Sequence, residues 1–117
     1  MVARLFQIGH AFDALMAEYR AARANLAALE AECDRISANA GVVYGSSAWA
    51  SRRHAACGHA VQTVNRLFCA LEDIAAEIAT HPARSLPCLL VKAKAHAFTG
   101  TPADIIPEIE ALLKEAA

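Results

Sequence analysis

The sequence lacks any long run of apolar residues. No window of about 18 apolar residues occurs in its 117 residues, so no membrane-spanning helix is expected. His10, Asp13 and Glu18 interrupt the first periodic stretch, which excludes the unbroken apolar core that a signal peptide would need there. We therefore expect a cytoplasmic protein without a membrane partner.

A charge excess of one sign is missing as well. The chain carries 11 basic and 12 acidic residues, with a net charge of −1, and the basic residues are dispersed among acids. Nucleic-acid binding depends on a basic stripe or patch, and anionic membrane surfaces attract the same feature. Neither is an expected partner.

Motifs that carry chemistry are also absent. The cysteines at positions 33, 57, 69 and 88 include no C-x-x-C pair and are expected to be reduced thiols. There is no glycine-rich phosphate loop, and no Glu-x-x-His motif of the di-metal helical bundles. No nucleophile can be assigned a neighbouring base and an orienting third group. The sequence therefore predicts neither an enzyme nor a bound cofactor.

What is present is a seven-residue repeat of apolar residues. Between residues 5 and 36 the steps alternate between three and four, which is typical of a coiled-coil-like helix, at Leu5, Ile8, Phe12, Leu15, Tyr19, Ala22, Leu26, Leu29, Cys33 and Ile36. Parallel dimeric coiled coils prefer β-branched residues at the a positions, whereas this repeat places two aromatic residues and a cysteine there. The pattern predicts one long helix, weakened only at Gly9, whose partner helix lies in the same chain.

A second long helix is predicted after a connection at residues 39–47. Ser46 or Ser47 can cap its start, and His81-Pro82 ends it near Thr80. Its apolar stripe is wide enough to contact more than one neighbour. In the connection, Val42, Val43 and Tyr44 are apolar and are expected to fold back onto the ends of the helices.

Two short helices are predicted in the C-terminal part. Ser85 can cap the first, from about 86 to 99, and Gly100 suits its end. Its expected apolar face excludes Lys92, Lys94 and His96 and consists of Leu86, Leu89, Leu90, Ala93 and Ala97. For the second helix, Asp104 is the favoured N-cap, and the alternative is a single turn at 102–105 followed by a kink.

These elements predict an all-α fold in one domain over residues 1–117. Its architecture is an antiparallel helical hairpin of two long helices plus two short C-terminal helices, arranged like a bundle. The segment 82–95 (Pro82-Ala83-Arg84-Ser85-Leu86-Pro87-Cys88-Leu89-Leu90-Val91-Lys92-Ala93-Lys94-Ala95) resembles a stretch found in small uncharacterised α-helical proteins of bacteria. The resemblance rests on a proline turn, a capped start and an amphipathic helix, and it implies no activity.

One cluster of reactive side chains is the candidate for a small-ligand or metal site. His54 and Cys57 are three residues apart and share a helix face, and an imidazole with a thiolate can form part of a zinc site. Two further ligands would have to come from elsewhere in the chain. The other interpretation is that Cys57 belongs to the core and His54 is solvated. Arg52 and Arg53, beside this cluster, are a candidate for binding an anion at a helix start.

The main candidate interaction surface is a row of alanines on the first helix, opposite much of its apolar repeat. We call it the alanine ridge: Ala14, Ala17, Ala21, Ala24, Ala28 and Ala31. A solvated helix back normally carries Glu, Lys and Gln, whereas alanines allow another helix to approach closely. The ridge can be covered by the C-terminal helices, by a second copy in a homodimer, or by nothing, since alanine also favours helix on its own. We favour a non-enzymatic interaction or assembly role, as a homodimer or with another helical protein.

Overall fold

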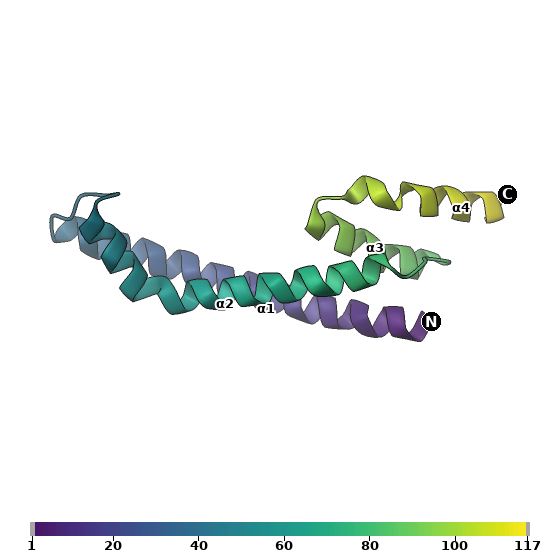
Figure 1. Ribbon diagram of the computed structural model, residues 1–117, viewed down its shortest axis with the longest axis horizontal. Coiled ribbons are helices and arrows are strands. Elements are labelled where there is room, and N and C mark those ends of the chain that lie inside the picture. The colour runs from purple at the N-terminus through teal and green to yellow at the C-terminus, as the bar shows by residue number, and fades with distance from the viewer. Residues whose placement is uncertain (1, 117) are drawn as a thin grey trace. The chain divides into compact units, whose positions relative to one another are not determined.

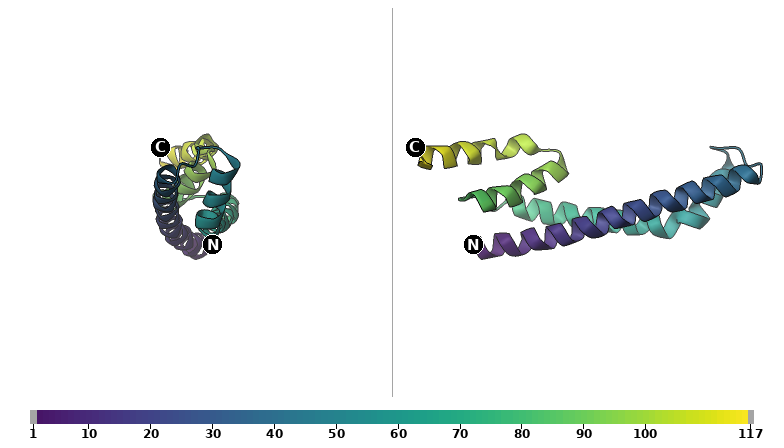
Figure 2. Two further views of the ribbon diagram at one scale, coloured as in Figure 1. Left: turned by 90° about the vertical axis from the view of Figure 1, so that its left-hand side faces the viewer. Right: turned by 180° about the vertical axis from the view of Figure 1, so that it is seen from behind.

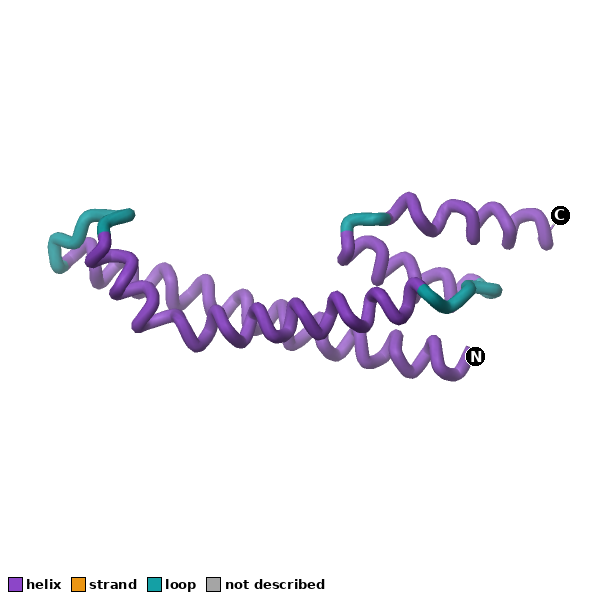
Figure 3. The backbone as a smooth tube through the Cα atoms, viewed as in Figure 1, coloured by secondary structure: helices purple, strands orange, loops and turns teal. Residues whose placement is uncertain are grey.

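The computed structural model describes residues 2–116, and nearly all of them are helical (Figures 1 and 3). The elements in chain order are α1 (Val2–Asn39), α2 (Ser47–Ala79), α3 (Leu86–Thr99), the 3₁₀ turn η1 (Pro102–Ile105) and α4 (Ile106–Ala116). No strand occurs between residues 2 and 116. The predicted all-α fold, with two long antiparallel helices and two shorter C-terminal ones, is confirmed. Over this described range, none of the helices combines the length and apolar character that crossing a membrane requires.

The chain packs as two compact units. One unit combines Met1–Met16 with Cys69–Ala117, and the other is the continuous stretch Ala17–Phe68. The long helices α1 and α2 therefore contribute to both units. The expectation of one domain over 1–117 stays a prediction.

The unit of residues 17–68 is a two-helix hairpin (Figure 2). Its connection turns at Gly41 and Gly45, whose φ angles of 77° and 82° are unfavourable for residues with a side chain. Ser46 caps α2 because its Oγ accepts a hydrogen bond from the Trp49 amide at 3.2 Å. The expectation that the apolar loop residues fold back is wrong for Val43 and Tyr44, which are exposed. Tyr44 contacts the ring of Trp49, at 4.5 Å between centroids, but this contact leaves most of its surface in water.

The other unit has the denser core. Its fully or almost fully buried side chains come from the start of α1, the end of α2 and from α3: Leu5, Ile8, Phe12, Leu71, Ala75, Ile78, Cys88 and Ala95. Phe12 of α1 and Phe98 of α3 meet edge to face, with ring centroids 5.9 Å apart. Gly9, which the sequence marked as a weak point of the helix, is buried here. A Cβ atom at Gly9 would lie 3.0 Å from Val91 Cγ1, so the missing side chain lets α3 pack closely on α1.

The caps of α3 were predicted correctly, but its buried face was not. Ser85 Oγ accepts a hydrogen bond from the Cys88 amide, and Gly100 ends the helix with a φ angle of 76°. The side chains that α3 buries are Cys88, Lys92, Ala95 and His96, whereas the expected face at Leu86 and Leu90 is exposed. The reason is that Lys92 and His96 have polar partners inside the unit, described below.

The expected N-cap at Asp104 is wrong, and the alternative is right. Residues Pro102–Ile105 form a 3₁₀ turn, and α4 begins only at Ile106. This places Pro107 in the first turn of α4, where its missing N–H has no partner to lose. Ile105 is buried and fixes the turn against the unit.

Candidate functional site

The alanine ridge faces outward along α1. All six of its alanines are exposed. Ala14 belongs to the unit that contains the C-terminal helices and is exposed there. The other five lie in the hairpin of residues 17–68, and the α2 part of that hairpin leaves them exposed. Within each unit, the ridge is a surface without a helix on it.

Two apolar side chains of the α1 repeat are exposed as well. Leu29 is 37% exposed and Ile36 is 48% exposed, although both belong to the apolar repeat of α1. A hairpin of two helices explains this, because each helix can cover only one side of its neighbour. The predicted repeat is therefore only partly buried by the partner helix in the same chain.

Two adjoining hollows lie between α1 and α2 beside these residues, and we call them together the α1–α2 groove. They have volumes of about 330 and 370 Å³ and share Ala56. The first is lined by Ala22, Asn25, Leu29, Ala56, His59, Ala60 and Thr63, and the second by Cys33, Ile36, Ser37, Arg52, Ala55 and Ala56. Most of these side chains are small, so the groove has an apolar floor at which backbones are close to the surface.

A cluster of polar side chains links α1 to α2 near the connection of the hairpin. Asp34 accepts hydrogen bonds from Trp49 Nε1 at 2.9 Å, Arg53 Nε at 2.9 Å and the Arg53 terminal nitrogen at 2.7 Å. Arg53 also donates to Glu30 at 2.8 Å, and its guanidinium stacks 4.9 Å from the centre of the Trp49 ring. The bidentate geometry fixes the register of α2 against α1. Arg53, one of the two candidate anion-binding arginines, is thus occupied by carboxylates of its own chain.

The hydrogen bonds of this cluster shift the pKa values of Asp34 and Arg53. The bonds from Arg53 hold the pKa of Asp34 below its ordinary value, with a smaller contribution from Trp49, against the opposing effect of desolvation. The same pairing, chiefly the bond to Asp34, raises the pKa of Arg53. Asp34 is therefore ionised down to a lower pH in the folded protein than in the unfolded chain.

Acidification should weaken the hairpin through Asp34. An aspartate whose pKa is lower in the folded than in the unfolded chain gives its full stabilisation above the unfolded-chain pKa of about 3.9, and loses it as the pH falls through the folded-state pKa. We expect the urea midpoint of the wild-type protein to fall more steeply below about pH 4 than that of Asp34→Asn. Fluorescence of Trp49, the only tryptophan, reports on this end directly. If the urea midpoints of the two proteins fell equally with pH, the pH dependence would not come from Asp34.

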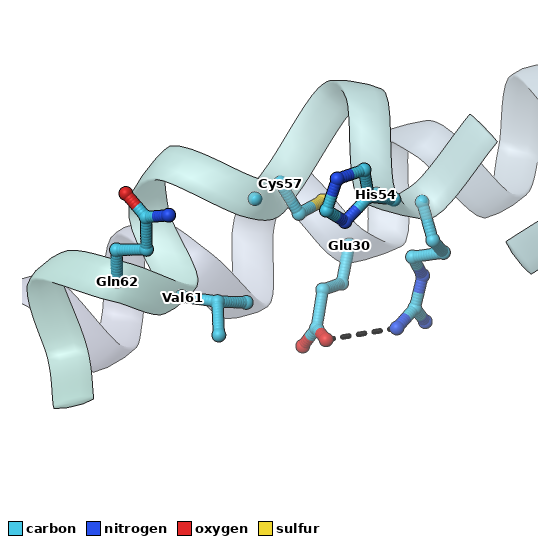
Figure 4. A pocket seen from close by; sticks show the side chains of 7 residues that line it. Glu30, His54, Cys57, Val61 and Gln62 are labelled. Atoms are coloured by element: carbon cyan, nitrogen blue, oxygen red, sulfur yellow. Dashed lines mark hydrogen bonds and ion pairs between the residues drawn. The ribbon is translucent and has the colours of Figure 1, made fainter. Parts of the chain in front are cut away.

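The predicted small-ligand or metal candidates lie on the opposite side of the hairpin from the groove residues. A hollow of about 250 Å³ is lined by Glu30, Arg53, His54, Cys57, Gly58, Val61 and Gln62 (Figure 4). His54 is exposed, whereas Cys57 is buried, and burial raises the pKa of the Cys57 thiol, with neighbouring Cys33 adding to the effect. A thiolate is the form that binds zinc, and burial disfavours the thiolate form of Cys57. Within residues 2–116 no three His, Cys, Asp or Glu side chains are grouped so that they could hold a metal ion.

Sequence reasoning missed two buried polar groups in the other unit. Lys92 is 3% exposed, forms an ion pair with Glu108, and donates to the Ala79 carbonyl at 3.3 Å. His96 is also buried, with Nδ1 at 3.0 Å from Thr101 Oγ1. Both stand on the same helix face as Cys88 and Ala95. The partners of Lys92 come from α2 and α4, whereas His96 has its partner Thr101 just after α3. These partners all belong to the same unit, so the two buried groups help to stabilise it.

Comparison with known proteins adds no relative: no protein-family model, curated protein or solved structure matches this chain.

Proposed function

We propose that this protein is a non-enzymatic interaction and assembly module that self-associates through the outer face of α1. The observations that carry the proposal are the exposed alanine ridge and, on the α2 side of the same helix, the partly exposed Leu29 and Ile36. Removing exposed alanine side chains from water lowers the free energy. Because these side chains are small, a second helix can approach closely and also cover the two larger side chains. The cytoplasm is the proposed location, and another helical protein is the alternative partner.

The small size of the hairpin gives a thermodynamic reason for self-association. Two helices bury only the side chains between them, so each retains an apolar surface that a third or fourth helix would cover. Dispersed charges of both signs do not oppose such contact over most of the surface. Association of two hairpins would complete a four-helix arrangement from identical parts.

Placing a charge on the ridge should weaken self-association. Ala28→Arg puts a cation on the ridge one turn before Glu32, so the helix itself retains a favourable neighbour. Because an unpaired charge at a helix interface is costly, we expect the dimer dissociation constant to rise at least about tenfold. Light scattering after size-exclusion chromatography measures this change.

A matched control separates interface effects from general effects of the substitution. Ala76→Arg places the same residue at an exposed position of α2, one turn after Glu72. It should leave the oligomeric state unchanged. If both variants behave like the wild-type protein, the ridge is not the interface, and a wild-type protein that is monomeric at high micromolar concentration removes self-association altogether.

A further inference from the structure

The two sides of the α1–α2 groove carry opposite charges. On α1, positions at alternating steps of four and three flank the groove: Glu18, Ala22, Asn25, Leu29, Glu32 and Ile36. On α2, an equivalent set flanks the other side: Arg52, Ala56, His59, Thr63 and Arg66. We call these the acidic line and the basic line, because the charged residues are two glutamates in the first and two arginines in the second. All eleven positions are exposed or half-buried.

The charges are also evenly spaced. Two heptads separate Glu18 from Glu32, and two heptads separate Arg52 from Arg66. The residues that line the shared hollows show that Ile36 lies at the level of Arg52, and Asn25 near the level of Thr63. Because the two helices are antiparallel, residue numbers fall along α1 as they rise along α2. By this count, Glu32 lies within one turn of the level of Arg52, and Glu18 lies within one turn of the level of Arg66. The two lines thus have the same spacing at matching levels.

These charges are largely unused inside the chain. Among residues 2–116, Glu18, Arg52 and Arg66 have no ion pair. Glu32 pairs with Arg35 one turn away, and both side chains are more than half exposed. Pairs of that kind contribute little to stability, so Glu32 can exchange its partner at small cost.

We propose that a second copy of this chain occupies the α1–α2 groove, with the acidic line of each copy against the basic line of the other. The two-fold axis then runs parallel to the helices, so that α1 of one copy lies on α2 of its partner at the same level. Glu18 meets Arg66 of the second copy, Glu32 meets Arg52, and both pairs occur twice. Leu29 is covered between the two pairs and Ile36 at the end beside the Glu32–Arg52 pair, and Ala21 and Ala28 form the neighbouring edge of the contact.

Charge selects this arrangement over the other symmetric one. A two-fold axis perpendicular to the helices would place α2 on α2 and bring Arg52 of one copy towards Arg66 of the other. Like charges opposed across an interface are unfavourable and suppress that mode of binding. The inference rests on the self-association proposed above. It moves the centre of the contact from the ridge to the adjoining α1–α2 groove and adds the axis and the paired residues.

Charge reversal in two separate variants tests the arrangement. The acidic-line variant is Glu18→Arg with Glu32→Arg, and the basic-line variant is Arg52→Glu with Arg66→Glu. Each alone opposes like charges at all four contacts, so its dimer should be at least about tenfold weaker than that of the wild-type protein. An equimolar mixture should form a 1:1 heterodimer, because each variant then meets the opposite charge. Native mass spectrometry resolves the two masses.

This test has its own control, and its outcomes separate failure of the groove arrangement from failure of self-association. Arg20→Glu with Arg84→Glu makes the same change of net charge as the basic-line variant, but outside the two lines, and should leave dimerisation unchanged. A wild-type dimer that tolerates both line variants, or a mixture that yields no heterodimer, overturns the groove arrangement and leaves self-association intact. A wild-type monomer overturns both, and helicity measured by circular dichroism verifies that each variant is folded.

Discussion

Replacement of Leu71 by alanine is expected to lower the free energy of unfolding by about 2–5 kcal/mol. Leu71 is 0% exposed and lies in the densest part of the core, with Leu5 and Ile78 among the other fully buried side chains. Removing its isobutyl group loses the transfer free energy of the buried atoms and leaves a cavity that rigid helices cannot close. Urea denaturation followed by circular dichroism measures the loss.

A second leucine serves as the control. Leu113 on α4 is 65% exposed, so Leu113→Ala should change the free energy of unfolding by no more than about 0.5 kcal/mol. Equal losses for the two substitutions would show that the core does not lie around Leu71.

Replacement of Lys92 by methionine is expected to cost about 3 kcal/mol, the lower end of the range for breaking a buried ion pair. Lys92 is almost completely buried, whereas the side chain of its partner Glu108 is 25% exposed, so water can partly solvate the carboxylate that is left behind. Methionine retains the length of the side chain, which limits the loss to the charge and its hydrogen bonds. Thermal or urea unfolding gives the difference.

Two further variants identify the cause. In the double variant Lys92→Met with Glu108→Gln, no charge is left unpaired, and the glutamine oxygen can still accept the bond that Glu108 takes from the Ala83 amide at 2.8 Å. We expect the double variant to recover at least about half of the loss. Lys94→Met breaks a pair with Asp13 whose side chains are both about half exposed, and should cost less than about 1 kcal/mol. If Lys92→Met were as mild as Lys94→Met, the buried pair would have no role in stability.

Local signals in the sequence predict most of the helices and their limits. The apolar repeat predicts α1, and Ser46, Ser85 and Gly100 mark helix ends by short-range chemistry that does not depend on the rest of the fold. The buried face of α3 could not be predicted in this way. Apolar residues occur all round that helix, and the burial of Lys92 depends on Glu108, which is 16 residues away and carried by another helix.

Part of the candidate interaction surface could also be predicted from local signals, and part of it could not. The alanine ridge is a property of one helix, so its spacing is visible in the sequence. The groove and its charged lines require the register of α2 against α1, which Asp34 and Arg53 fix across the hairpin. The spacing of His54 and Cys57 correctly places them on one face, but only the structure shows that Cys57 is buried beside Cys33 rather than open to a ligand.

Sedimentation equilibrium of the wild-type protein is the most direct test of self-association. Over a range from low to high micromolar concentration, the weight-average mass should rise from 12.4 kDa towards twice that value and level off there. A mass that stays at 12.4 kDa throughout would contradict the account, because the exposed face of α1 would then have no second copy to cover it.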